Sequence, residues 1–342
     1  MKKYFPFLLL TAILFTACKK HHHDIESSGT DIYVAGEENG VAKYWKNGTA
    51  VSLSNGSYVA YAASVFVSGS DVYAAGFEKN ANGNIVAKYW KNGTPVNLTD
   101  GSYNAYARSI FVSGSDVYVA GSEYNATSGK YAAKYWKNGT AVSLSDGSYN
   151  ADAYSVFVSG SDVYVAGFEM NAGGNSVAKY WKNGTAVSLT NGSYSAIAYS
   201  VFVSGSDVYV AGWESNTGGK SVAKYWKNGG ETNLTNGSYN ANARSIFVSG
   251  NDVYVAGDEE DAGGQNVAKY WKNGGEANLT NGSYNAGASS VFVSGSDIYV
   301  AGDEGDASGK NIIRYWKNGT AVSLAEGSSE STFSGSIFVV QY

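Results

Sequence analysis

The chain of 342 residues is poor in the side chains that most often carry catalysis, metal binding or covalent cross-linking. Its one cysteine, Cys18, cannot form a disulfide within the chain. Its three histidines are consecutive, at residues 21–23, so residues 24–342 hold neither Cys nor His. Nucleophilic catalysis by a Cys–His or Ser–His pair, and zinc sites with His or Cys ligands, are therefore excluded from that part of the chain.

Proline and charge are also scarce. Two prolines and an interior without low-complexity tracts argue against disorder. Charged residues make up 15% of the chain, and the net charge of -5 comes without a basic stripe, which argues against nucleic-acid binding. The remaining composition is rich in Gly and Tyr, and about 310 residues are enough to bury a large core.

The N-terminus has the pattern of a secretory signal. Lys2 and Lys3 precede an apolar run over residues 4–15, which is too short for a comfortable membrane span, and Thr-Ala-Cys follows at residues 16–18. This ending resembles the lipobox of bacterial lipoproteins, although Phe15 stands where Leu is commonest. The resemblance implies a signal peptide over residues 1–17, a lipidated Cys18 and a place in a bacterial cell envelope, facing the periplasm or the cell surface. An ordinary signal with a chance Cys is the alternative.

Residues 18–30 form the expected link between this anchor and the folded domain. The stretch KKHHHDIESSG at residues 19–29 is polar and has no periodicity, so we expect a flexible tether. Its three histidines could bind a metal adventitiously, but a solvated linker accounts for them.

One segment recurs along the rest of the chain. The Asp that opens its second predicted strand returns at intervals of 40, 45, 46, 45, 45 and 45 residues, at Asp31, Asp71, Asp116, Asp162, Asp207, Asp252 and Asp297. A period in the forties with several short strands in each unit is typical of a β-propeller, in which four-stranded blades surround an axis. Seven copies predict seven blades.

Each repeat contains four strand signals, found in one copy at residues 155–159, 162–167, 177–182 and 185–189. Asn-Gly at residues 183–184 predicts a tight hairpin between the last two. The strands are apolar on both faces, so both faces must be covered, as blades packed against blades would be. We therefore expect seven recurring tryptophans to pack between blades rather than to form a sugar-stacking ring: Trp45, Trp90, Trp136, Trp181, Trp226, Trp271 and Trp316.

The two ends of the repeat region complement each other. The first copy begins at its second strand, residues 31–36, and the last residues, 336–340, match a first strand with no successor. The C-terminal strand should therefore complete the first blade and close a seven-bladed ring over residues 31–342, which removes both sheet edges.

This arrangement resembles the kelch-type propellers, which are commonly closed in the same way. The resemblance covers residues 31–342 and is one of topology, because the second strand ends in Ala-Gly rather than Gly-Gly and Tyr and Trp are adjacent. It implies a kelch-like fold and no particular ligand.

Nearly all differences between copies fall in the loops between strands two and three and in the connections from strand four to the next blade, which should share one face. Aromatic residues beside Arg and Asp suit carbohydrate or peptide recognition. Three residues form the best candidate cluster: Trp213, Tyr199 and Arg244. The wider set of candidate ligand-binding residues adds Phe168, Tyr154, Arg108 and Phe77. Ordinary surface aromatics, or loops that drift after duplication, are the alternative.

A Glu at the end of strand two and a basic residue in strand three also recur in every copy. We expect cross-strand pairing of each Glu with its Lys or Arg, and a ring of carboxylates around a cation is the alternative. The acidic stretches 258–261 and 303–306 could hold calcium, but they lack a recognised ligand spacing, so no cofactor is expected.

Three functions follow as hypotheses. The first is a lipid-anchored envelope module that binds a glycan, peptide or partner protein on the variable face. The second is an enzyme that acts on polysaccharide through carboxylates, although the unique acid Asp152 has no obvious partner in the sequence. The third is a passive structural repeat protein. No feature indicates oligomerisation, so a monomer is expected.

Overall fold

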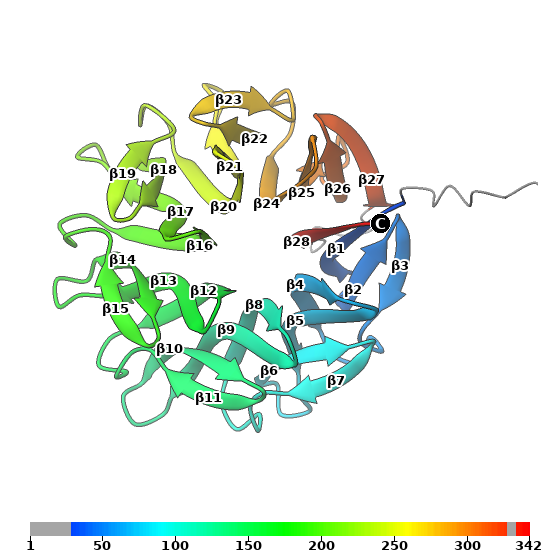
Figure 1. Cartoon of the computed structure of the whole chain (residues 1–342), viewed down its shortest axis with the longest axis vertical. Coiled ribbons are helices and arrows are strands. Elements are labelled where there is room, and N and C mark those ends of the chain that lie inside the picture. Colours follow the sequence, from blue (N-terminus) through cyan, green and yellow to red (C-terminus); the bar gives the residue numbers. More distant parts are fainter. Residues whose placement is uncertain (1–28, 327–332) are drawn as a thin grey trace, which may run out of the picture.

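A computed structural model describes residues 29–326 and 333–342. The predicted signal peptide, residues 1–17, and Cys18 lie outside these residues. The described chain is all-β and forms seven four-stranded antiparallel sheets arranged as blades around an axis (Figure 1). The prediction of a closed seven-bladed propeller is confirmed. No helix in the described part of the chain is long and apolar enough to cross a membrane.

The four strands of each blade run outward from the axis. The innermost strands are β28 (Phe333–Gln341), β4 (Ala60–Ser68), β8 (Ala105–Ser113), β12 (Ala151–Ser159), β16 (Ala196–Ser204), β20 (Ala241–Ser249) and β24 (Ala286–Ser294). The second strands are β1 (Thr30–Glu38), β5 (Asp71–Lys79), β9 (Asp116–Asn125), β13 (Asp162–Met170), β17 (Asp207–Ser215), β21 (Asp252–Glu260) and β25 (Asp297–Gly305).

The outer half of each blade is shorter. The third strands are β2 (Val41–Lys46), β6 (Ile85–Lys91), β10 (Lys130–Lys137), β14 (Ser176–Lys182), β18 (Ser221–Lys227), β22 (Asn266–Lys272) and β26 (Asn311–Lys317). The outermost strands are β3 (Thr49–Ser52), β7 (Thr94–Asn97), β11 (Thr140–Ser143), β15 (Thr185–Ser188), β19 (Gly230–Asn233), β23 (Gly275–Asn278) and β27 (Thr320–Glu326). We number the blades from 1, which contains β1, to 7, which contains β27.

One face of the ring, here called the hairpin face, carries the turns from the first to the second strand and from the third to the fourth. In every blade the latter is an Asn-Gly turn with both residues at positive φ, as at Asn183 (51°) and Gly184 (83°). Each turn is tied to the Asp that opens the second strand: Asn183 Nδ2 donates to Asp162 Oδ1 at 2.8 Å, and Lys182 Nζ lies 2.8 Å from Asp162 Oδ2. The same contacts recur in all seven blades, which explains why this face barely varies.

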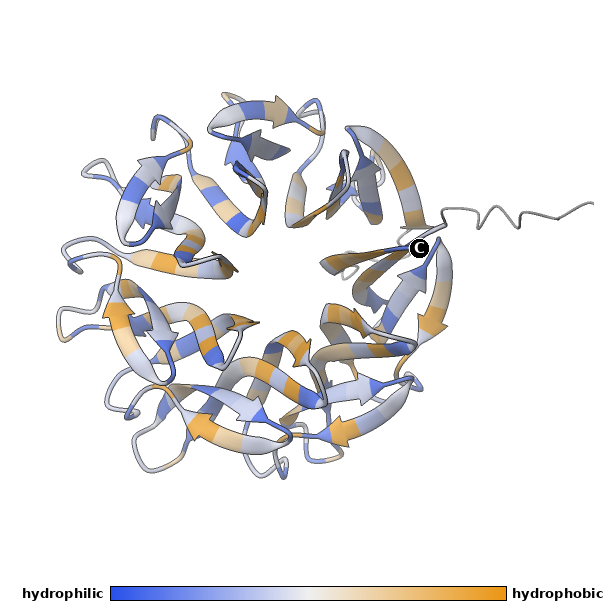
Figure 2. Cartoon of the chain, viewed as in Figure 1, coloured by the Kyte–Doolittle hydropathy of each residue, from blue (hydrophilic) through white to orange (hydrophobic). Residues whose placement is uncertain are grey.

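The core consists of seven clusters, and each lies between two neighbouring blades. The interface of blades 3 and 4, for example, brings Tyr118 and Leu144 against Val165 and Trp181. All seven recurring tryptophans are fully buried, which confirms that they pack between blades. Apolar residues are concentrated in the strands, whereas the loops around the rim are mostly hydrophilic (Figure 2).

Closure of the ring takes place inside blade 1. Strand β28 pairs with β1 from Thr30↔Gln341 to Glu37↔Phe333, so the C-terminal strand supplies the innermost position of the first blade (Figure 1). Just beyond the ladder, Tyr342 N donates to Gly29 O at 3.0 Å. The sheet order β28-β1-β2-β3 confirms the predicted closure.

Two closed rings of side chains surround the axis, and β28 completes both. Neighbouring Phe rings lie 4.7 to 5.1 Å apart around the series Phe66, Phe111, Phe157, Phe202, Phe247, Phe292 and Phe338, and the last returns to the first. One serine of each innermost strand accepts a hydrogen bond from a backbone N–H of the next blade, at 2.8 to 3.2 Å, and this series is Ser64, Ser109, Ser155, Ser200, Ser245, Ser290 and Ser336. The seven blades are thus joined by polar as well as apolar contacts.

Candidate functional site

Each innermost strand contains a β-bulge directly before its ring serine. In blade 4 the register with β13 shifts between Ala153 and Ser155, which leaves Tyr154 as the extra residue. The bulge recurs in every blade and places one residue per blade out of register: Ala63, Arg108, Tyr154, Tyr199, Arg244, Ser289 and Gly335. The sequence analysis assigned these positions to the loops between blades, and that was wrong, because the innermost strands begin about four residues earlier than expected.

The Ala-Gly at the middle of each second strand is what accommodates the bulge. A Cβ on Gly167 would lie 2.0 Å from the carbonyl oxygen of Asp152, and one on Gly76 would lie 1.8 Å from that of Tyr61. Only glycine permits this close approach of two backbones. Bulges often re-aim side chains beside functional sites, and here all seven bulged residues line a shallow cavity of about 340 Å³ on the axis.

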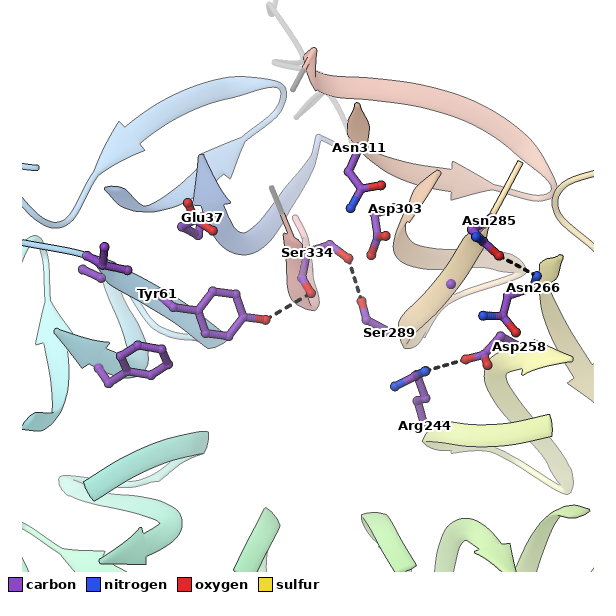
Figure 3. A pocket seen from close by; sticks show the side chains of 15 residues that line it. Glu37, Tyr61, Arg244, Asp258, Asn266, Asn285, Ser289, Asp303, Asn311 and Ser334 are labelled. Atoms are coloured by element: carbon purple, nitrogen blue, oxygen red, sulfur yellow. Dashed lines mark hydrogen bonds and ion pairs between the residues drawn. The ribbon is translucent and has the colours of Figure 1, made fainter. Parts of the chain in front are cut away.

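A larger cavity of about 800 Å³ lies off the axis, between blades 6, 7, 1 and 2 (Figure 3). Blade 7 presents small residues there, Gly287 and Ser289, where blades 3 to 5 carry larger side chains at corresponding positions, such as Tyr106 and Tyr199. We call this cavity the junction pocket.

The walls of the junction pocket differ in chemistry. Tyr61 and Phe77 form an aromatic wall in blade 2, with their ring centroids 5.8 Å apart. The rest of the lining is polar and holds Arg244, three carboxylates and three amides: Glu37, Asp258, Asp303, Asn266, Asn285 and Asn311. Figure 3 shows Asp303 and Asn311 on the blade 7 side and Glu37 across the pocket from them. An aromatic wall facing convergent polar groups is typical of a site for a polar organic ligand.

Two of the carboxylates have perturbed pKa values. The pKa of Asp303 is raised to about 6, chiefly by burial, while the charge of Arg244 lowers it and that of Asp258 raises it. Asp303 has no hydrogen-bond or salt-bridge partner among residues 29–326 and 333–342, so its carboxylate is available to a ligand. Burial also raises the pKa of Glu37, although the Gly40 N–H donates to this carboxylate and opposes the shift.

The third carboxylate is already neutralised. Arg244 Nε lies 2.5 Å from Asp258 Oδ1, and Asn242 Nδ2 donates to Asp258 Oδ2 at 2.9 Å. The Asp258 side chain is 3% exposed and the Arg244 side chain 42% exposed. The ion pair therefore holds Arg244 at the pocket wall while leaving its terminal nitrogens accessible.

The other predicted site residues form a packed aromatic belt in blades 3 to 5. Arg108 Nη2 lies 2.7 Å from Asp152 Oδ2, and the Arg108 guanidinium stacks 5.0 Å from the ring of Tyr154. The structure thus gives Asp152 the partner that the sequence did not reveal. Tyr154 packs on Phe168 at 6.1 Å and against Tyr199 at 5.2 Å.

The predicted cluster of Trp213, Tyr199 and Arg244 is brought together only in part. Trp213 Nε1 donates to the Tyr199 hydroxyl at 3.2 Å. Tyr199 and Arg244 line the axial cavity, whereas Trp213 and Phe168 line neither it nor the junction pocket. Phe77 lies in the junction pocket, as part of its aromatic wall.

Sequence reasoning gave no special weight to Asp303, Glu37 or Tyr61, and it overlooked the amides Asn266, Asn285 and Asn311. One signal could have found the site. Gly287 and Ser289 occupy two positions where most other blades carry larger residues such as Tyr, Arg or Asn. Small residues at both positions of one blade predict a gap between that blade and its neighbours.

The predicted pairing of recurrent Glu and basic residues is confirmed in all seven blades, at 2.5 to 3.0 Å, as in Lys179–Glu169. In the acidic stretch 258–261, Asp258 binds Arg244, Glu259 binds Lys269 and Asp261 accepts from backbone N–H groups. Among the residues that the structure describes, no three or more His, Cys, Asp or Glu side chains are grouped to hold a metal ion.

No protein-family model matches this chain, and no curated protein sequence matches it. Solved structures do resemble it. The β-propeller domain of the Trilobed protease from Pyrococcus furiosus, described as having an open velcro topology, is 9% identical over 89% of this chain and 95% of that one, with a TM-score of 0.53. The six-bladed fucose-binding lectin of Aleuria aurantia is 11% identical over 79% and 95%, with a TM-score of 0.45. At these identities the likeness concerns the fold alone, and the present chain differs from the first by its closure through β28.

Proposed function

We propose that this protein is a lipid-anchored binding module of the bacterial envelope that holds a glycan, a peptide or a segment of a partner protein in the junction pocket. One observation carries the proposal: variable residues of blades 6, 7, 1 and 2 line one cavity of about 800 Å³ that has an aromatic wall and contains the unpartnered carboxyl group of Asp303. A passive repeat protein has no need of Asp303, a largely buried carboxyl group without a partner in the described part of the chain.

The chemistry of the pocket favours a polar ligand that is neutral or positively charged. Asp258 is neutralised by Arg244, so Glu37 and Asp303 leave the pocket with an excess of carboxylate at neutral pH. Sugar hydroxyls or an ammonium group could satisfy these carboxylates, while Tyr61 and Phe77 cover the apolar side of the ligand.

A thermal-shift screen of residues 24–342 against glycans, peptides and calcium tests the proposal. A ligand at a hundred times its dissociation constant stabilises the folded state by about 2.7 kcal/mol. We expect a stabilising glycan or peptide whose effect is lost in Asp303→Asn and Asn311→Ala. Lys182→Ala on the hairpin face is the matched control and should respond as the natural protein does. Stabilisation that survives both pocket substitutions would place the ligand elsewhere.

A polysaccharide hydrolase is the second candidate, because a carboxyl group with a pKa of about 6 is suited to general acid catalysis and Glu37 shares its pocket. Release of reducing ends from a bound polysaccharide, lost in Asp303→Asn, would favour it over a binding module. Stable binding without turnover would reject it.

The lipid anchor and the envelope location rest on the sequence around Cys18. Labelling of the natural protein with a radioactive fatty acid, and loss of the label in Cys18→Ser, would support them. Unlabelled protein would contradict the anchor and leave the pocket proposal intact. The kelch-like relationship likewise stays a prediction from topology.

A further inference from the structure

Six connections between blades carry an identical exposed feature on the variable face. Each has the sequence Asn/Asp-Gly-Ser-Tyr, at residues 55–58, 100–103, 146–149, 191–194, 236–239 and 281–284, and we call these segments the tyrosine turns. Their tyrosines are 39–48% exposed, and none of the six hydroxyl groups has a hydrogen-bond partner within residues 29–326 and 333–342: Tyr58, Tyr103, Tyr149, Tyr194, Tyr239 and Tyr284. The fold therefore leaves a partly exposed tyrosine at every junction from blade 1 to blade 7.

The tyrosine turns are held firmly. In the turn before blade 6, Ser238 N donates to Asn236 Oδ1 at 2.9 Å, and Gly237 takes a positive φ of 75°. The turn is bonded to the blade before it, because Asn216 Nδ2 donates to Gly237 O at 3.0 Å. It is also bonded to the blade after it, because Glu260 N donates to Asn240 O at 2.8 Å. The tyrosine is thus presented with little freedom to lose on binding.

Two of these turns border cavities that share a tyrosine and an ion pair, although the second cavity also contains Glu260, Asp261 and Glu276 and is more acidic. The cavity beside Tyr58 is about 430 Å³ and also contains Glu78 and Lys88, and the cavity beside Tyr239 is about 500 Å³ and contains Glu259 and Lys269. Every one of these residues has its counterpart four repeats later in the sequence. The same Glu with Lys or Arg stands beside all six turns, so the arrangement repeats around the rim.

We propose that the six tyrosine turns form equivalent rim sites, distinct from the junction pocket, that bind the neutral sugar units of a polysaccharide. The apolar face of a pyranose packs on the exposed tyrosine ring. Glu78 and Lys88 lie 2.5 Å apart and neutralise each other, so the recurring part of each site, the tyrosine and the ion pair, carries no net charge but offers both a donor and an acceptor to hydroxyl groups. A neutral polyol is the ligand that uses both.

The number of sites explains how weak contacts could suffice. One half-exposed ring and one ion pair make a poor site for a single sugar. Six sites on one rigid ring raise the affinity for a polymer with repeated units by about 10² to 10⁴ over that of one site. The matched repeats therefore suit a ligand that is itself repetitive, whereas the unlike residues of the junction pocket suit a single ligand.

Native affinity electrophoresis of residues 24–342 in gels containing laminarin, dextran, xyloglucan or mannan tests the proposal. We expect retardation by at least one of the four. Replacement of one, three and then all six tyrosines by Ala should weaken retention stepwise, with a loss of about 100-fold or more in apparent affinity for the sixfold variant. The six Tyr→Phe variant keeps the rings and should keep most of the retention.

Folding and the independence of the two sites are controlled separately. Tyr342→Ala removes a 66% exposed tyrosine outside the tyrosine turns and should change nothing, and circular dichroism reports whether the sixfold variant is folded. Asp303→Asn should leave retention unchanged, so failure of the junction pocket and failure of the rim sites are distinguishable. Retention by none of the four polymers, or equal retention of a folded sixfold Ala variant, would overturn the proposal.

Discussion

Two neighbouring positions in each innermost strand behave in opposite ways. The ring serine is the same in all seven blades, and in each it accepts a backbone N–H of the next blade. The bulged residue directly before it is Ala, Arg, Tyr, Tyr, Arg, Ser or Gly. Closure of the ring thus requires serine at the first position in every blade, but it does not specify the residue at the adjacent, bulged position.

The β-bulge accounts for this difference. It takes one residue out of the ladder, so the side chain at this position is not held by the contacts that repeat in every blade, and the contacts that it does make, such as Arg108 with Asp152, differ from blade to blade. Identical residues at one position therefore indicate a structural requirement, and unlike residues at the next indicate freedom that a ligand site can use. The following four predictions test this contrast, in order of decreasing effect.

Deletion of residues 335–342 should have the largest effect. It removes Ser336 and Phe338 from their rings, takes Ile337 and Val339 out of a core cluster that also contains Val34 and Trp45, and exposes the edge of β1. We expect the melting temperature to fall by roughly 10 °C or more, since several kcal/mol are lost from a domain of this size. Differential scanning calorimetry measures this, with deletion of residues 341–342 alone as the control. An unchanged melting temperature would refute closure through β28.

Gly167→Ala should destabilise the domain by about 3 kcal/mol, because the new Cβ would lie 2.0 Å from Asp152 O and would force the bulge to shift. Gly287→Ala is the matched control, since its Cβ would meet nothing within 4 Å. Urea denaturation compares the two. Equal stability of both variants would mean that the bulge does not depend on glycine.

The pair Ser64→Ala and Ala63→Ser tests the contrast at its sharpest. Loss of the Ser64 hydroxyl leaves the Ile110 N–H without its acceptor at 3.2 Å and should cost about 1 to 3 kcal/mol. Ala63→Ser changes the adjacent bulged residue and should stay within about 0.5 kcal/mol. Urea denaturation again decides, and a larger cost at residue 63 than at residue 64 would contradict the contrast.

Asp303→Asn should stabilise the domain at neutral pH. Because the pKa of Asp303 is raised to about 6 in the folded state, the folded state binds more protons than the unfolded state between pH 4 and 6, and stability falls as the pH rises through that range. The variant lacks this titrating group, so its free energy of unfolding should exceed that of the natural protein by roughly 1 to 2 kcal/mol at pH 7 and should equal it at pH 4. Part of the decrease in stability with rising pH should remain in the variant, because the pKa of Glu37 is also raised. Thermal unfolding from pH 4 to 8 measures the effect, and a variant less stable at pH 7 would show that Asp303 has a stabilising partner.

The sequence could predict the features that are the same in all blades, but not those that differ between blades. The buried tryptophans and the pairs of Glu with Lys or Arg recur seven times, so the repeat predicts them together with the number of blades, and the incomplete first and last copies predict the closure. The bulge breaks the alternation of strand residues, and Arg108 and Tyr154 were therefore assigned to loops. The small residues of blade 7 could indicate a gap, but the lining of the junction pocket could not be predicted, because it depends on how Gly287 faces Glu37 and Tyr61 once the ring has closed.

The position of β1 within its sheet has a mechanical consequence. Although β1 is the first strand in the sequence, it is an inner member of its blade, with β28 on one side and β2 on the other. A pulling force applied through the residues before Thr30 would enter the sheet along β1, parallel to the strand, and would have to shear both ladders together instead of peeling an edge strand one hydrogen bond at a time. A domain tethered through this end to a membrane would therefore resist detachment forces, such as fluid drag on a captured polymer, through both hydrogen-bond ladders of β1.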